Sequence, residues 1–154
     1  MSNLSKHFDL AELLVSEAAV RNDIDMTPTA SVLDNLRNLA SEVLEPIREQ
    51  VMGPLVITSG YRPKALNDLI GGSKDSDHLT GCAADVHAPG MSLYDLSKIV
   101  DRLKMQIPLK QAILEFNQWL HVSIQSQGEA PRREFLTASR DNGRTVYTSG
   151  IQSA

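Results

Sequence analysis

The chain is poor in cysteine and in aromatic side chains. Cys82 is the single cysteine among 154 residues, so no disulfide can form within the chain, and Phe, Trp and Tyr together make up 5% of it. No segment approaches the roughly 18 apolar residues of a transmembrane helix, and the N-terminal residues contain no apolar signal-peptide region. These absences predict a protein that is made in the cytoplasm, has no membrane partner and reaches an extracellular target only through another factor.

An excess of positive charge is also missing. The chain has 15 Lys and Arg residues against 19 Asp and Glu residues, which gives a formal net charge of −4. The basic residues are scattered, and only Arg132 and Arg133 are adjacent. This distribution argues against a nucleic-acid partner and against tight binding to anionic wall polymers. The length fits one domain with a single core, and we expect a monomer.

Apolar residues at helical spacing predict four helices. They cover residues 10–20, 29–50, 65–70 and 92–105. Pro46 should kink the second helix or end its regular part, because proline has no backbone N–H to donate. Gly71 and Gly72 should close the third helix, and Ser92 is a suitable N-cap for the fourth.

Short apolar runs bounded by turn residues predict strands. They cover residues 55–58, 82–86, 111–116, 119–124 and, as an edge strand, 145–148. Because helices and strands do not alternate regularly, we expect an α+β fold with a mostly antiparallel central sheet flanked by helices. The expected single domain, residues 1–154, consists of a helical part at about 8–50, a core at about 55–124 that carries the metal site considered next, and a polar tail at 125–154.

The stretch from Ser76 to Asp85 contains the residues most typical of a metal site. His78 precedes Asp85 by seven residues, and Gly81 between them lets the chain bend so that both side chains can face one point. His121 lies on another predicted strand. Imidazole nitrogen and carboxylate oxygen suit zinc, and three protein ligands leave an open position, as in catalytic sites. The spacing also fits a simpler interpretation, in which Asp85 pairs with an arginine or backbone amides and the histidines are ordinary polar residues.

Several short motifs together resemble one peptidase family. They are Ser59-Gly60-Tyr61-Arg62, Leu66-Asn67, Gly71-Gly72-Ser73, the segment Ser76-x-His78-x-x-Gly81-x-Ala83-x-Asp85, and Trp119-x-His121-x-Ser123. This set is similar to the zinc D-Ala-D-Ala carboxypeptidase and L-alanyl-D-glutamate endopeptidase family, which includes many phage endolysins and shares its fold core with Hedgehog signalling domains. The resemblance extends to about Ile124, and residues 4–8 resemble the opening of one small branch of the family.

The resemblance implies one zinc ion per chain, with the ligands His78, Asp85 and His121. It implies that Arg62 contacts a substrate carboxylate or an oxyanion, which a guanidinium can hold with two hydrogen bonds. A surface salt bridge is the alternative for Arg62. Ser76 supports the metal loop or touches the substrate, and the alternative is a simple loop-capping hydroxyl. We expect Trp119 in the wall of the substrate site, packed there rather than stacked on a sugar.

One position departs from the family pattern. Several members have an acidic general base three residues before the last histidine, where this chain has Gln118. Glu115 is the nearest carboxylate, and a three-residue loop at 117–119 would place it opposite His121 on the same face. A two-residue loop would instead pair Leu114 with His121 and point Glu115 away. We expect Glu115 to be the catalytic base, and the alternative is an exposed strand residue.

These residues predict a metallopeptidase that hydrolyses a peptide bond in the stem peptides of bacterial peptidoglycan. Such a cell-wall lytic or remodelling enzyme could be a phage lysis enzyme released by a holin, a particle-borne enzyme or an enzyme of cytoplasmic peptide recycling. The same residues suit a carboxypeptidase, a dipeptidase and an endopeptidase. The alternative is a non-catalytic phage structural or binding module that keeps the fold, and Gln118 is the one sequence feature that favours it.

Overall fold

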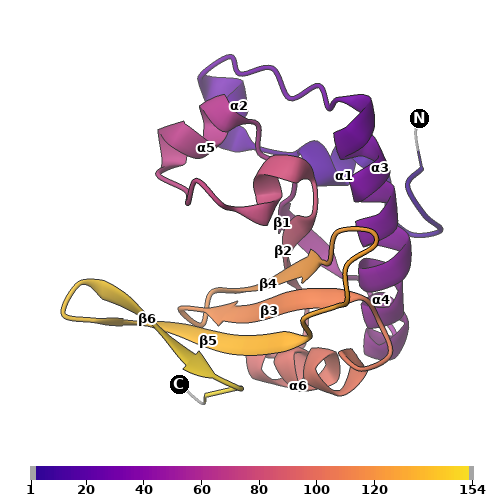
Figure 1. The fold of residues 1–154 in the computed structure, drawn as a ribbon, viewed down its shortest axis with the longest axis vertical. Helices are drawn as coiled ribbons and strands as arrows, with labels where there is room; N and C mark the ends of the chain where they lie inside the picture. Colours follow the sequence, from indigo (N-terminus) through magenta and orange to yellow (C-terminus); the bar gives the residue numbers. More distant parts are fainter. Residues whose placement is uncertain (1–2, 153–154) are drawn as a thin grey trace.

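The computed structural model describes residues 3–152, which form a six-stranded sheet with helices packed against it (Figure 1). The strands are β1 (Val56–Ser59), β2 (Ala83–His87), β3 (Leu109–Glu115), β4 (Trp119–Ile124), β5 (Glu134–Asp141) and β6 (Arg144–Ser149). Their order is β1-β2-β4-β3-β5-β6, and all neighbouring pairs in it are antiparallel except β3 and β5. The predicted α+β fold with a mostly antiparallel sheet is confirmed.

Residues 10–20 form two short helices rather than the single helix that was predicted. These are α1 (Leu10–Leu14) and α2 (Glu17–Arg21). Asp9 begins α1 with a capping box that it shares with Glu12, and the chain leaves the helix at Val15, where ψ is 128°. The hydroxyl of Ser16 then accepts a hydrogen bond from the first turn of α2. Serine competes in this way for backbone donors, which favours a new helix start over continuation.

The predicted helix at 29–50 is one continuous helix of three parts. They are α3 (Ala30–Leu39), the π-helical segment η1 (Ala40–Leu44) and α4 (Glu45–Val51). Thr29 caps its start by accepting a hydrogen bond from the backbone of Val32. The backbone N–H of Glu45 donates to Ala40, five residues back, and Pro46 follows in the first turn of α4. Since Pro46 offers no N–H, the change of helix type just before it accommodates the proline without breaking the helix.

The apolar core lies between one face of the sheet and two helical elements. The long helix and α6 (Leu93–Leu103), which Ser92 caps, pack on this face (Figure 1). Fully buried side chains meet there, including Leu36, Val100, Leu120 and Val122. Burial of each such side chain stabilises the fold by roughly 1.5–3 kcal/mol, so this face fixes the sheet in place. None of the helices within residues 3–152 is both long and apolar enough to cross a membrane.

The opposite face of the sheet carries polar side chains at its centre. Ala84 lies opposite Val122 and belongs to the core, whereas the next pair in the ladder, Asp85 opposite His121, is one residue away on each strand. Successive side chains of a strand point to opposite faces, so Asp85 and His121 both point away from the core helices. The short helix α5 (Lys64–Ile70) and the 3-10 helix η2 (Asp77–Thr80) complete the chain between β1 and β2, and η2 packs against β2.

A hairpin at residues 134–149 extends the sheet beyond β3, and only half of it was predicted. β6 contains the expected edge strand at 145–148, but β5 was not expected, and it pairs in parallel with β3. The turn contains Asn142 and Gly143, both with positive φ. Asn-Gly between two strands is a strong hairpin signal, so this turn could have been found in the sequence.

Candidate metal centre

Three side chains from η2, β2 and β4 meet on the polar face of the sheet. One nitrogen or oxygen atom each from His78, Asp85 and His121 lies within 4.8 Å of the others, and all three residues are buried. Nε2 of His78 lies 3.2 Å from Oδ1 of Asp85, and Nδ1 of His121 lies 3.1 Å from the same oxygen. The structure therefore brings the predicted ligand residues together at one point.

A backbone carbonyl orients the ring of His78. Its Nδ1 lies 2.7 Å from the carbonyl oxygen of Gly60, and because a carbonyl only accepts, Nδ1 must carry a proton. In the neutral ring Nε2 is then a bare lone pair, and it faces a carboxylate oxygen of Asp85, which is also an acceptor. Two acceptors at 3.2 Å repel each other unless the ring gains a second proton or a cation lies between them.

Gly60 is needed at this position because two segments approach very closely. A Cβ atom on residue 60 would lie 2.3 Å from the carbonyl oxygen of Leu13, at the end of α1. The N–H of Tyr61 donates to that same oxygen at 2.8 Å. The contact with α1 thus fixes the chain leaving β1 and holds the Gly60 carbonyl that orients His78. Sequence analysis missed this role, since it depends on a contact between distant segments.

Ser76 connects the metal loop to Arg62. Its Oγ accepts a hydrogen bond from the backbone N–H of His78 at 3.2 Å, which caps η2. The same oxygen accepts a second hydrogen bond from Nη2 of Arg62, also at 3.2 Å. Ser76 is therefore both a loop cap and a support for Arg62. At the other end of η2, Gly81 ends the helix in the left-handed conformation, with φ 79°, which a residue with a side chain rarely adopts.

Burial and hydrogen bonding act against each other on Asp85. Burial alone would raise the pKa of its carboxyl group, but the hydrogen bonds and positive charge that His121 and His78 can provide hold the pKa well below its usual range. The carboxylate therefore stays ionised at neutral pH. A buried anion of this kind needs a positively charged partner, which a proton on an imidazole or a metal ion supplies.

The β3–β4 turn differs from both predicted registers. The loop consists of residues 116–118, so Glu115 pairs with Trp119 and Ile113 pairs with His121. Glu115 still lies on the same face as His121, because it is two residues from Ile113. Its Oε1 lies 3.9 Å from Nδ1 of His121, and its Oε2 accepts a hydrogen bond from Nε1 of Trp119 at 3.1 Å.

The cause of the shifted register is the conformation of Phe116. Both Phe116 and Asn117 have a φ of 53°, in the left-handed region. Asparagine adopts this conformation readily, but it is uncommon for a bulky aromatic residue, so sequence rules do not start the turn at Phe116. The turn leaves Glu115 largely covered, and burial raises the pKa of this carboxyl group despite the opposing effect of His121.

Arg62 lies at the edge of the same site. Burial lowers the pKa of its guanidinium, while the nearby carboxylates of Asp85 and Glu115 raise it, and an arginine stays charged throughout the physiological range. Its Nε is buried and has no hydrogen-bond partner among the described residues. A buried N–H without a partner is costly, so this group is well suited to an anionic ligand.

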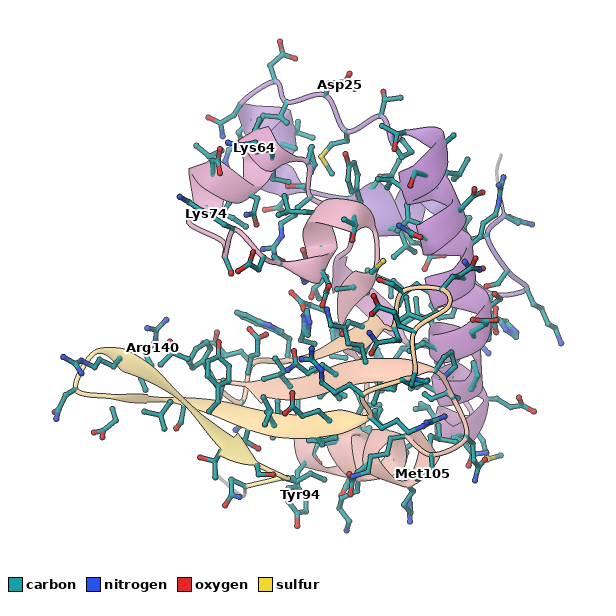
Figure 2. The ribbon with its side chains drawn as sticks, viewed as in Figure 1. Asp25, Lys64, Lys74, Tyr94, Met105 and Arg140 are labelled. Carbon is teal, nitrogen blue, oxygen red and sulfur yellow. The ribbon has the colours of Figure 1, made fainter. Side chains whose placement is uncertain are left out.

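A cleft of about 350 Å³ joins all the predicted site residues. Its lining includes the three candidate ligands and the predicted substrate contacts, namely His78, Asp85, His121, Arg62, Ser76, Glu115 and Trp119. The loop after α5 and the C-terminal hairpin both contribute to its lining, and Figure 2 labels Lys74 on this loop and Arg140 on the hairpin. Sequence analysis gave no role to Tyr147 of β6, which also lines this cleft.

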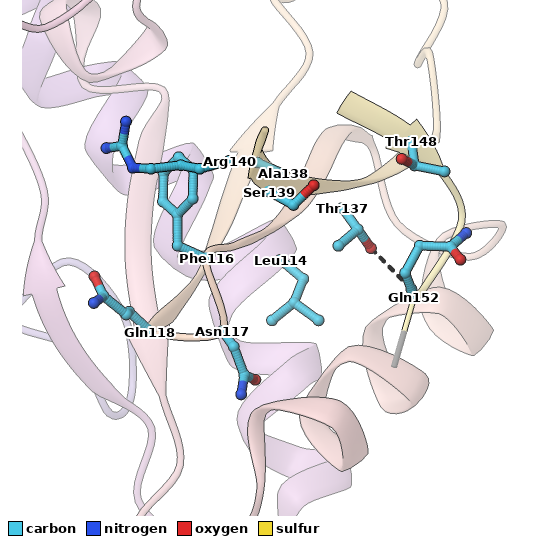
Figure 3. A pocket seen from close by; sticks show the side chains of 10 residues that line it. All are labelled: Leu114, Phe116, Asn117, Gln118, Thr137, Ala138, Ser139, Arg140, Thr148 and Gln152. Carbon is cyan, nitrogen blue, oxygen red and sulfur yellow. Dashed lines mark hydrogen bonds between the residues drawn. The ribbon is translucent and has the colours of Figure 1, made fainter. Parts of the chain in front are cut away.

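Two other polar side chains close to these residues in the sequence, Gln118 and Asp77, have different environments. Gln118 lines a separate hollow between the β3–β4 turn and β5, beside Phe116 and Arg140 (Figure 3). Asp77 lines the cleft, but its carboxylate pairs with the ammonium group of Lys110 at 2.9 Å. Glu115 is therefore the acid that directly neighbours a candidate ligand.

The donor set fits a zinc ion. Two imidazole nitrogens and one carboxylate oxygen are typical zinc ligands, and three protein ligands leave room for a reacting molecule. A metal-binding histidine commonly donates its other ring N–H to a carbonyl, as His78 does to Gly60. An α+β chain with this donor set beside a carboxylate and an arginine has the features of a metallopeptidase.

The comparison with known families agrees with this class. Residues 6–123 match the family described as Peptidase M15, and because the match covers well over half of the chain, the protein belongs to this family. The family resemblance in the sequence is confirmed. A comparison with curated proteins gives no match. The family match ends before β5, so the C-terminal hairpin lies outside it.

Proposed function

We propose that this protein is a zinc metallopeptidase that hydrolyses a peptide bond in peptidoglycan stem peptides. The observation that carries the proposal is the contact between two acceptors, Nε2 of His78 and Oδ1 of Asp85, at 3.2 Å. A divalent cation held by these atoms and by Nδ1 of His121 would replace repulsion with attraction. We expect one zinc ion per chain, held by these three residues.

Bound zinc lowers the pKa of a water molecule toward neutrality and polarises a peptide carbonyl. Glu115 can then act as the general base. One of its oxygens is held by Trp119, and the other lies 3.9 Å from Nδ1 of His121. Glu115 would accept a proton from this water and return it to the leaving amine.

Arg62 supplies the positive charge for the substrate. Its Nη2 donates a hydrogen bond to Ser76. Its buried Nε has no hydrogen-bond acceptor among the described residues, so a ligand could accept from it. A peptide carboxylate or the oxyanion that develops on the scissile carbonyl would provide that acceptor. Ser76 keeps Arg62 beside the ligand loop, and Trp119 forms part of the wall that the peptide contacts.

A digestion experiment tests this function. Zinc-loaded protein is incubated with purified peptidoglycan and with soluble muropeptides, and the products are identified by mass spectrometry. We expect new fragments whose masses correspond to hydrolysis of one type of peptide bond, and the same experiment identifies that bond. The matched control is Glu115→Gln, which keeps the size and the Trp119 neighbour but cannot accept the proton. Zinc-loaded wild-type protein that leaves all these substrates intact would contradict the proposal.

The second candidate function is a non-catalytic phage module. The one sequence feature that favoured it argues less strongly for it once the structure is considered. That feature is the glutamine at position 118 in place of an acid. Gln118 lies in a different hollow from the candidate ligands, whereas Glu115 is beside them. A base at position 115 makes the loss of an acid at position 118 compatible with an active enzyme.

A further inference from the structure

The C-terminal hairpin, β5 with β6, lies outside the family match but contributes a side chain to the cleft. Tyr147 of β6 lines the same cleft as the three candidate metal ligands. The side chain is 58% exposed, although aromatic rings usually bury most of their surface. A single exposed aromatic residue is unremarkable on its own, but Tyr147 also has a distinctive position in the sheet.

The strand register places Tyr147 in one row with the proposed catalytic base. Trp119 pairs with Glu115, Glu115 with Ala138, and Ala138 with Tyr147. Residues directly opposite each other in neighbouring strands share a face, so the row presents an aromatic ring at each end. Ala138 lies between Glu115 and Tyr147 in this row, and its side chain is a single methyl group, so no long side chain of β5 separates the two residues.

The length of this row sets the size of the ligand. Three strand spacings of about 4.8 Å separate the Trp119 and Tyr147 backbones by about 14 Å. An extended peptide advances about 3.3 Å per residue, so a ligand that spans the row needs about four residues. A dipeptide, at about 7 Å, covers only about half of this row.

We infer that Tyr147 is a specificity-determining residue that gives the site a preference for extended stem peptides over short ones. This inference rests on the proposed function and refines it by naming the substrate length. The ring offers an apolar face either to the distant part of the peptide or to the sugar attached to it. Tyr147 contacts the substrate several residues from the scissile bond. Its replacement therefore changes the affinity for the substrate and does not change the rate of the chemical step.

Binding to an inactive variant tests this inference without relying on turnover. In zinc-loaded Glu115→Gln protein, titration calorimetry compares D-Ala-D-Ala, a pentapeptide stem and the same stem carrying its disaccharide. Addition of Tyr147→Ala should lower the preference for pentapeptide over dipeptide roughly three- to tenfold, as expected for the loss of one aromatic contact. Tyr147→Phe should keep the preference. If Tyr147→Ala weakens only the binding of the stem that carries the disaccharide, the ring contacts the sugar, and the inferred preference for the longer peptide is wrong.

The matched control is Val146→Ala. Val146 is the neighbouring residue on the same exposed strand, and its side chain points to the opposite face, so this variant should keep the preference for long ligands. Equal loss of affinity for all three ligands in Tyr147→Ala, or no change for any of them, would overturn the inference. Parallel digestion by the wild-type protein separates the two proposals, because a preference for long ligands without any cleavage contradicts the enzymatic function alone.

Discussion

Two inner strands of the sheet and its C-terminal edge strand are built in different ways. Most residues of β2 and β4 are buried, whereas every residue of β6 is exposed. The candidate ligands Asp85 and His121 lie directly opposite each other in the buried pair. A slip of one residue there would turn both side chains into the core, so burial on the other face fixes their register. The exposed hairpin has no comparable constraint.

The family match follows the same division. Residues 6–123 include the buried strands and all the candidate ligands, and they exclude β5 and β6. The buried part of the sheet thus carries the candidate metal ligands, and the edge hairpin carries Tyr147, for which we propose a contact with the substrate. Sites are commonly built in this way, with selectivity residing in segments at the margin of a rigid scaffold.

The largest expected effect comes from removing a ligand in the buried pair. His121→Ala leaves two protein ligands, so zinc content should fall from about one ion per chain to nearly none, and activity should be lost. Elemental analysis after dialysis measures this, and Val146→Ala, on the exposed hairpin, should retain the ion. Groups that only support a ligand typically cost 10–100-fold in metal affinity, so the loss in His121→Ala should exceed about 100-fold. Full retention of zinc would show that the metal binds elsewhere.

Replacement of the proposed base should have the next largest effect. Glu115→Gln should lower kcat by about 10²–10⁴-fold, because general-base assistance typically contributes that much. Its zinc content and its thermal unfolding midpoint should stay close to those of the wild-type protein. Gln118→Ala is the contrasting variant, since Gln118 lines a separate hollow, and its kcat should change less than about threefold. A reversed order of these two effects would assign the base to position 118.

The sequence was sufficient to predict the family, and the three residues that its motifs indicated as ligands, His78, Asp85 and His121, lie together in the structure. It also placed Glu115 on the correct face with the wrong register. The predicted pairing of Glu115 with His121 differs by two residues from the observed pairing of Ile113 with His121. A shift of two residues preserves the face, since side chains alternate with a period of two.

Other features of the fold and the site could not be predicted from the sequence, because they depend on contacts between segments that are distant along the chain. The parallel partner of β5 is β3, and no local pattern in residues 134–141 indicates such a partner. The role of the Gly60 carbonyl depends on the approach of Leu13. Without β5 the position of Tyr147 relative to the cleft was also unknown, although Asn142 and Gly143 do signal the hairpin itself.

Two substitutions, one in the buried strand β4 and one in the exposed strand β6, compare how much each region contributes to the free energy of unfolding. Leu120 of β4 is fully buried, and Leu120→Ala should lower the free energy of unfolding by about 2–5 kcal/mol, through lost apolar contacts and a cavity. Val146→Ala on β6 should lower it by less than about 0.5 kcal/mol, because Val146 is 40% exposed and little of its side chain leaves water on folding. Urea denaturation followed by circular dichroism gives both values. Equal losses would show that the hairpin is as much a part of the core as β4.

The smallest expected effect concerns Arg62, at the margin between the buried strands and the open cleft. Arg62→Lys keeps the positive charge but loses the planar group that donates to Ser76 and presents a buried Nε. The value of kcat/KM should fall about tenfold, which is less than the roughly 10²–10³-fold loss typical when an oxyanion donor is removed outright. Zinc content should not change, because Arg62 is not among the candidate ligands. Steady-state kinetics together with elemental analysis separates these effects. An unchanged kcat/KM in Arg62→Lys would assign Arg62 to the support of the η2 loop, through Ser76, and would leave the substrate anion to another cation.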